Sequence, residues 1–311
     1  MRLWVKNRIV SIMQDAGSAQ TFIKGYLVGG TNGTATKLAN ALVYASKTIS
    51  QLVSSLSVAM SGMSGCSSNT NGYFGGGMNN SLAFSYAINK INSSVNVFSI
   101  IVGVLPTFHN MSGIVQSTLK GYFVSGLVTI TTYTSIITEF LFSTETTSNS
   151  VAGLTVARAY IASVNSLLAG YLFNGSTGTG AKSSIDKILF STDTICSKLG
   201  IQLANTNYGM IGLCNYINGY IAGGSSSNTT YQKIALSTET VSSMSLRLSG
   251  VGHRETQGIS SNLDGYSCGG MYSSSTYLNT IDDLTFSTET NTLLGIVLSV
   301  TVTDIAGCSV S

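Results

Sequence analysis

Apolar and polar residues alternate along this chain in short stretches, each of which ends in a run of Ser, Thr, Asn or Gly. In "IDKILF" at 185–190, Ile185, Ile188 and Phe190 are mixed with polar residues, as in a β-strand packed unevenly on its two faces. No apolar run reaches about 18 residues, the length that suggests a membrane-spanning helix. The best candidate, 95–105, ends at Pro106 and predicts a buried strand. The pattern therefore predicts an all-β protein with no membrane insertion.

One strand-like segment recurs several times along the chain, each time with the same C-terminal residues. "ITEFLFSTET" (137–146), "IDKILFSTDT" (185–194), "YQKIALSTET" (231–240) and "IDDLTFSTET" (281–290) are close copies, and weaker copies begin at Ala39 and Ile88. Each predicts a strand followed by a Ser/Thr turn, because these hydroxyls bond nearby backbone groups. One shared position of the turn holds an acid in four copies, Glu145, Asp193, Glu239 and Glu289, while the two weaker copies have Lys47 and Asn96 there. We expect a turn acid that accepts backbone N–H bonds; a ring of metal-binding carboxylates is the alternative.

A second repeated phrase gives the period. Gly-Tyr pairs begin near 25, 72, 121, 170, 219 and 265, with spacings of 46 to 49 residues. Each copy, such as "GYIAGG", opens a unit that contains four candidate strands. Four strands in about 40–50 residues is the signature of a propeller blade. The chain is therefore predicted to be a six-bladed β-propeller over 11–311, with four antiparallel strands per blade and almost no helix.

The repeat also resembles a known family. A Gly-Gly doublet after strand two and the "LTFSTETNTL" ending at 284–293 resemble the kelch repeat, with Phe286 where kelch has Tyr and Leu293 where kelch has Trp. The sequence pattern of the repeats is similar to that of repeats in bacteriophage virion and tail proteins. The resemblance implies a kelch-like propeller of the kind found in virion and tail proteins.

The two ends offer one strand more than six blades need. "MQDAGSAQTFI" at 13–23 and "DIAGCSVS" at 304–311 both resemble a first strand, so one terminus pairs with the other or leaves the disc. Residues 1–10 are predicted to be an N-terminal arm or a closing strand. A docking arm would present Arg2, Trp4, Lys6 and Arg8. Lys6, Asn7 and Arg8 also interrupt any signal-peptide core, so completion in the cytoplasm of the producing cell is expected.

Composition excludes several function classes. Only 9% of residues are charged and the net charge is +3, without the clustered Lys and Arg of a nucleic-acid-binding surface. The five cysteines are odd in number and form no C-x-x-C pair, so neither a disulfide framework nor a zinc site is expected. No cofactor and no metal are predicted.

No catalytic set stands out. His109 and His253 lie about three units apart and cannot form a dyad in a closed ring. Most of the 12 acids occupy repeated positions, and the remaining ones form no suggestive pair for glycoside hydrolysis: Asp15, Glu255, Asp264 and Asp304. The protein is therefore predicted not to be an enzyme.

The segments between strands two and three vary between copies, while the strands keep their pattern. They are rich in Ser, Asn and Tyr, a composition that suits adaptable recognition; ordinary polar loops are the alternative. In a propeller these segments share one face with the connections between blades. The predicted recognition rim comprises Asn79, Asn80, Tyr86, Tyr133, Asn174, Asn228, Tyr231, Tyr272 and Tyr277.

Together these features predict a non-enzymatic virion protein of a phage tail, fibre or capsid surface, assembled in the host cytoplasm. Its expected partners are other virion proteins, with host-surface glycans as candidate ligands. The alternatives are a kelch-like scaffold for protein partners and a lectin or glycan hydrolase.

Overall fold

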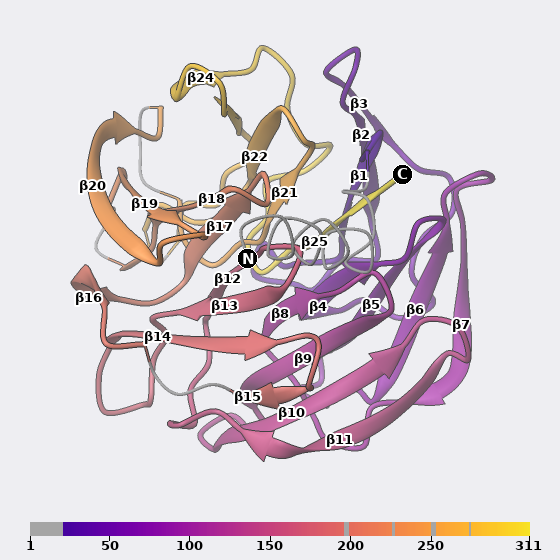
Figure 1. Ribbon diagram of the computed structural model, residues 1–311. Helices are drawn as coiled ribbons and strands as arrows, with labels where there is room; N and C mark the ends of the chain where they lie inside the picture. The colour runs from indigo at the N-terminus through magenta and orange to yellow at the C-terminus, as the bar shows by residue number, and fades with distance from the viewer. Residues whose placement is uncertain (1–20, 196–198, 226–227, 250–252, 274) are drawn as a thin grey trace, which may run out of the picture.

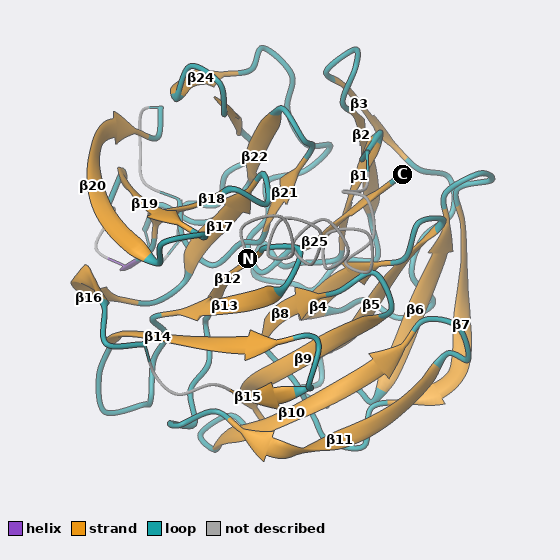
Figure 2. Cartoon of the chain, in the orientation of Figure 1, coloured by secondary structure: helices purple, strands orange, loops and turns teal. Residues whose placement is uncertain are grey.

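The computed structural model describes residues 21–195, 199–225, 228–249, 253–273 and 275–311. Its described strands form six antiparallel sheets, which Figure 1 shows arranged as blades around a centre. Loops and turns make up most of the remainder in Figure 2, and no α-helix occurs among the described residues. The six-bladed all-β propeller predicted from the repeats is confirmed. Within the described part of the chain, no helix is long and apolar enough to cross a membrane.

The strands of each blade follow one another from the inner strand at the centre to the outer strand. Blade 1 holds β25 (Ala306–Val310), β1 (Lys24–Val28), β2 (Ala39–Val43) and β3 (Thr48–Gln51). Blade 2 holds β4 (Ser61–Ser67), β5 (Asn71–Met78), β6 (Ala87–Asn92) and β7 (Val97–Val104). Blade 3 holds β8 (Gly113–Gln116), β9 (Lys120–Leu127), β10 (Tyr133–Leu141) and β11 (Thr146–Gly153).

The other three blades follow the same order. Blade 4 holds β12 (Ala162–Asn165), β13 (Ala169–Phe173), β14 (Lys182–Leu189) and β15 (Thr194–Ile195), and β16 (Gln202–Asn207) also pairs with β14. Blade 5 holds β17 (Met210–Cys214), β18 (Asn218–Gly223), β19 (Thr230–Ala235) and β20 (Thr240–Arg247). Blade 6 holds β21 (Gly258–Ser260), β22 (Asp264–Cys268), β23 (Ile281–Thr285) and β24 (Thr290–Leu293).

The C-terminus closes the ring. β25 pairs antiparallel with β1 in the register Tyr26↔Cys308 and fills the inner position of blade 1. Of the two first-strand candidates, the C-terminal one is therefore the strand that completes blade 1. The predicted arm residues Arg2, Trp4, Lys6 and Arg8 lie outside the described residues.

The hydrophobic core is divided among the contacts between neighbouring blades. The described residues form six buried clusters, and each joins two adjacent blades: Tyr26 of β1 packs with Phe74 of β5, for example, and Val115 of β8 packs with Leu172 of β13. Burial of apolar surface therefore holds each blade to its neighbours.

The repeated ten-residue element forms a lock between blades. Its turn residue has a left-handed φ between 49° and 56° in all six copies. In blade 3, Glu145 accepts a hydrogen bond from Tyr73 of blade 2 (3.0 Å) and one from Lys90 of blade 2 (2.6 Å). Phe142 of the same element stacks on the Tyr73 ring, with centroids 5.5 Å apart. The acid was expected to accept backbone N–H bonds of its own turn; instead it binds side chains of the preceding blade.

The other blades repeat this contact. The Gly-Tyr hydroxyl reaches the turn residue of the next blade in four more pairs: Tyr26–Asn96, Tyr122–Asp193, Tyr171–Glu239 and Tyr220–Glu289. A lysine of the same blade joins each of these pairs, namely Lys24, Lys120, Lys187 and Lys233. The repetition in the sequence therefore preserves an interface between blades.

The Gly doublets end strand two as predicted. In blade 5, Gly223 and Gly224 have φ of +72° and +98°, which L side chains rarely adopt. A Cβ on Gly223 would lie 2.1 Å from the carbonyl oxygen of His253. The doublet thus permits both a left-handed backbone and close approach of the next connection.

Candidate functional site

The disc has two unlike faces. The connections between strands two and three, and those between one blade and the next, lie on one face, which we call the loop face. The tight turns between strands one and two and between strands three and four lie on the other, which we call the turn face. The inner strands surround a central channel that runs between the two faces.

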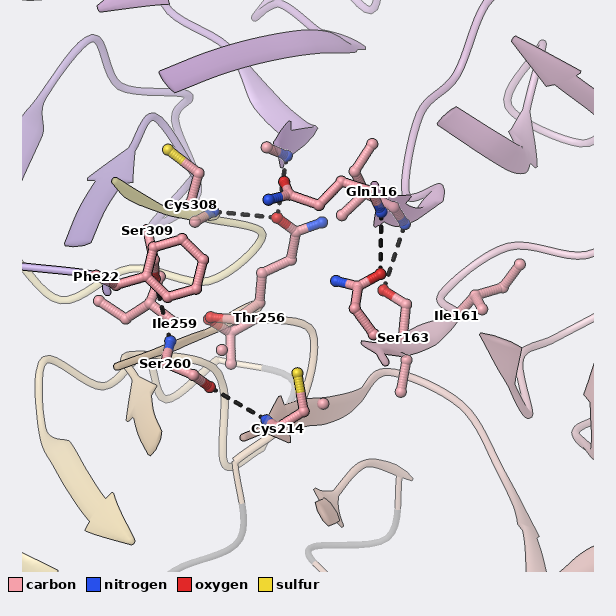
Figure 3. A pocket seen from close by; sticks show the side chains of 18 of the residues that line it. Phe22, Gln116, Ile161, Ser163, Cys214, Thr256, Ile259, Ser260, Cys308 and Ser309 are labelled. Carbon is pink, nitrogen blue, oxygen red and sulfur yellow. Dashed lines mark hydrogen bonds between the residues drawn. The ribbon is translucent and has the colours of Figure 1, made fainter. Parts of the chain in front are cut away.

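The channel is small, and polar groups that line it form hydrogen bonds with one another. A cavity of about 110 Å³ lies between the inner strands, as Figure 3 shows. N–H groups on the free edge of five inner strands, β4, β8, β17, β21 and β25, find side-chain acceptors from a neighbouring blade: Ser67 N donates to Gln116 (2.8 Å), and Gln116 N donates to Asn165 (2.9 Å). Gln257 accepts from the N–H groups of both Gly65 (3.2 Å) and Gly307 (3.0 Å). These polar residues therefore connect the blades.

A closed ring of backbone hydrogen bonds surrounds the channel at the loop face. It links one residue from each blade, and each N–H donates to the carbonyl of the preceding blade at 2.5–3.0 Å. All six residues have a left-handed φ between 53° and 68°. This mouth ring consists of Gly62, Met111, Tyr160, Gly209, Glu255 and Asp304.

The mouth ring brings two carboxyl groups together. Glu255 and Asp304 line one cavity with Tyr160 and Met111. Burial raises the pKa of Asp304 well above its ordinary value, and the charge of Glu255 raises it further. Burial also raises the pKa of Glu255, although the charge of Arg254 opposes this. Asp304 Oδ1 is buried without a hydrogen-bond partner among the described residues.

The sequence contains both acids but does not reveal their pairing by inspection. They stand one repeat apart at the same repeat position, so an alignment of the six copies could have found them. The fold does not require a side chain there, because glycine occupies the position in two blades, at Gly62 and Gly209.

Two predicted rim residues are buried, and for them the prediction of exposure is wrong. Asn174 is 0% exposed, because it takes the first doublet position of blade 4 with φ +55°. Tyr231 is also 0% exposed, because it is the second residue of β19 and takes the core position that Ile185 and Ile281 occupy in other blades; its hydroxyl donates to Asn291 (3.0 Å). Neither side chain lies on the rim.

The predicted asparagines on the loop face hold loops in place. Asn79 Oδ1 accepts from the N–H groups of Ser81 (2.9 Å) and Ala83 (3.0 Å), and Asn228 Oδ1 accepts from Thr230 N (3.0 Å). Asn80 bridges two blades, because its Oδ1 accepts from Ala35 N at 2.5 Å. Each of these side chains therefore has a structural role.

The remaining tyrosines offer contact area. Tyr86 and Tyr272 are 44% and 41% exposed, and Tyr86 stacks on Phe108 with ring centroids 3.9 Å apart. Tyr133 and Tyr277 are half-buried, and the ring of Tyr133 lies against Gly178 of the next blade. Whether the rim binds a partner stays a prediction.

Both histidines are structural. His109 in blade 3 is fully buried; its Nδ1 lies 2.7 Å from Ser125 O and its Nε2 lies 2.8 Å from Thr138 Oγ1. His253 in blade 6 is 1% exposed, with Nε2 3.3 Å from Asp282. Within the described residues, no three His, Cys, Asp or Glu side chains gather as a metal site would require.

Comparison with known proteins supports the fold. No protein-family model and no curated protein matches the chain. The chain is similar to the protein in a solved structure titled "Structure of YjhT", with a TM-score of 0.71 over 89% of this chain and 98% of that one. The identity is 13%, so this likeness shows the six-bladed propeller fold alone.

Proposed function

We propose that this protein is a non-enzymatic recognition propeller of a virion, which binds its partner through the loop face. This proposal includes the kelch-like character of the repeats and the origin of the protein in a phage particle. Both rest on the amino-acid sequence of the repeats. The observation that carries recognition is the mouth ring, where Tyr160, Glu255 and Asp304 present polar side chains at positions that glycine fills elsewhere.

The chemistry of the mouth suits a hydroxylated or cationic ligand. Glu255 and Asp304 supply acceptors, and one carboxyl oxygen there is buried and unpartnered. A buried acceptor without a partner is costly, so a donor from a ligand would be favourable. Tyr86 and Tyr272 add exposed aromatic faces elsewhere on the loop face. Host-surface glycans and loops of other virion proteins both carry such donors.

The test measures binding by folded variants to a glycan array and to particles that lack the protein. We expect Asp304→Asn and Tyr272→Ala each to weaken binding about tenfold, because buried polar contacts and aromatic anchors dominate recognition. Val95→Ser is the control, since Val95 is 63% exposed on the turn face. Parent-like binding by both loop-face variants would contradict the proposal.

A glycan hydrolase is the second candidate, favoured by one observation: two carboxyl groups with raised pKa values share the mouth cavity. Acid–base chemistry uses such groups. Release of reducing ends from a bound glycan by the parent, lost in Glu255→Gln, would favour this candidate over simple recognition.

A further inference from the structure

The turn face carries exposed aliphatic side chains at one repeated position. This position lies two residues before each Gly-Tyr pair. In blades 2 to 6 it stands at the tip of the connection between the inner strand and strand two; in blade 1, where the inner strand is the C-terminal β25, it directly precedes strand two. Thr70 occupies it in blade 2. The other five blades place an apolar residue there, with exposures of 56%, 68%, 55%, 68% and 72%: Ile23, Leu119, Leu168, Ile217 and Leu263. We call these five residues the aliphatic ring.

The fold does not demand apolar side chains at these tips. Each tip is fixed through its backbone: Leu119 N donates to Ser117 Oγ (3.2 Å), and Leu119 O accepts from Phe142 N (3.0 Å). A polar residue serves equally well, as Thr70 shows, and its carbonyl accepts from Ser93 N in the same way. Turn tips normally favour Gly, Asn and Asp. Five exposed aliphatic residues gathered on one face therefore point to a covered surface.

The surroundings of the aliphatic ring carry little free charge. The turns outside it hold the locks between blades, where lysines already pair with acids, as in Lys90–Glu145 (2.6 Å) and Lys120–Asp193 (2.5 Å). An apolar segment with a few basic side chains could lie there without repulsion.

The described chain begins on this surface. Phe22 is among the residues that line the channel, as Figure 3 shows. It stacks on Tyr216, which lies in the turn between β17 and β18 on the turn face, with ring centroids 6.2 Å apart. Ile23, the next residue, belongs to the aliphatic ring. Twenty residues precede Thr21, and they include Leu3, Trp4 and further apolar residues beside Arg2, Lys6 and Arg8.

We propose that residues 1–20 of the same chain cover the aliphatic ring. The segment starts from the ring itself, and an extended chain of that length, at about 3.3 Å per residue, reaches every tip. Its apolar residues match the exposed aliphatic side chains. In the isolated protein this contact would hide the surface that the five tips expose.

Trp4 is the chain's one tryptophan, so its fluorescence reports on this segment directly. The experiment compares iodide quenching and emission maximum of the full-length parent with a triple variant, Leu119→Ser, Leu168→Ser and Leu263→Ser. The matched control is Val53→Ser, Val102→Ser and Ile130→Ser, three strongly exposed apolar residues elsewhere on the molecule, with exposures of 105%, 100% and 65%. We expect quenching to rise severalfold and emission to shift to the red in the ring variant only.

Far-UV circular dichroism and the thermal midpoint check that both triple variants are folded. A second measurement replaces Leu3 and Val5 by Ser and follows a hydrophobic dye: we expect dye binding to appear, and to disappear again when the ring substitutions are added. Trp4 as exposed in the parent as in urea would overturn the proposal. A change in Trp4 emission on dilution would also overturn it, because the occupant would then be the segment of a second copy.

Discussion

At the scale of single residues, the tyrosine of the Gly-Tyr pair stabilises the interface between blades, through its hydroxyl at five junctions and through ring stacking at four. Tyr122 stacks on Phe190 of the next blade and donates to Asp193 at 2.6 Å. Burial alone would raise the pKa of Asp193, but the hydrogen bonds from Lys120 and Tyr122 lower it, so the carboxylate stays charged. The phrase that recurs in every repeat therefore encodes matched partners on neighbouring blades.

A buried histidine gives the first prediction at this scale. Burial lowers the pKa of His109 from 6.5 to about 4, although the hydrogen bond to Ser125 opposes this. The unfolded chain therefore binds a proton that the folded chain does not, and stability is complete above pH 6.5 and falls as the pH drops toward 4. By pH 5 the loss from this group is about 2 kcal/mol.

The measurement is urea unfolding at pH 7 and pH 5 for the parent and for His109→Gln. Other buried groups titrate too, so the decisive quantity is the difference between the two proteins. The variant is expected to be less stable at pH 7 but to lose less on acidification. Equal losses in both proteins would mean that His109 does not contribute to the pH dependence.

The residues that sequence reasoning misplaced have a common cause. Asn174 and Tyr231 were assigned to the recognition rim because Asn and Tyr are common in binding loops. In the aligned repeats, however, Asn174 takes a doublet position and Tyr231 takes a core position. Glu255 and Asp304 are visible in the sequence but not as a pair, since their proximity depends on a left-handed backbone at six successive mouth positions. Alignment of the copies could have corrected the first error and shown that the two acids share one repeat position; the closed ring was needed to show that they line one cavity.

At the scale of elements, the junction between blades 6 and 1 reverses the charges of the other junctions. The turn position holds Lys47, and the preceding blade supplies Asp283 (2.5 Å) and Asp264 (3.5 Å). At four of the other junctions a lysine reaches forward to a turn acid, and at the fifth Lys24 reaches Asn96. Burial raises the pKa of Asp283 while Lys47 opposes this; burial would lower the pKa of Lys47, but Asp283 and Asp264 raise it.

Charge reversal at this junction is the second prediction. Lys47→Glu places a third acid beside Asp264 and Asp283, and the expected cost is about 1–2 kcal/mol, limited because Lys47 is 37% exposed. Adding Asp283→Lys recreates the arrangement of the other junctions and should recover most of the loss. Thermal unfolding at low and high salt measures both, and high salt should reduce the difference. A double variant no better than the single one would contradict this account.

The elements themselves were largely predictable. The repeated ten-residue element forms strand three and the turn after it in every blade, and the Gly doublets lie at the end of strand two. Both features were predictable because local backbone preferences set them. The partner of the turn acid was not predictable, since the Tyr73–Glu145 bond joins residues 72 apart in sequence.

At the scale of the whole molecule, closure decides whether six blades act as one body. Each blade leaves an apolar face that its neighbour covers, so a gap in the ring would expose two such faces. The closing strand β25 is buried along most of its length, at Ala306, Cys308 and Val310, and it belongs to the clusters on both sides of blade 1 through Ala306 and the adjoining Ile305. Its residues also enter the channel lining, where Gly307 N donates to Gln257 (3.0 Å).

Removal of residues 306–311 is the last prediction. The truncated chain loses the inner strand of blade 1, three buried side chains and the β1–β25 ladder, a loss of roughly 5 kcal/mol or more in unfolding free energy. A total stability of about 5–15 kcal/mol is typical, so we expect loss of cooperative thermal unfolding and association through the exposed edge of β1. Removal of Ser311 alone is the matched control and should leave the transition unchanged. A truncated protein that stays monomeric and unfolds cooperatively would show that the ring holds together without its closing strand. The contacts between blades would then have to contribute more to stability than the closing strand does.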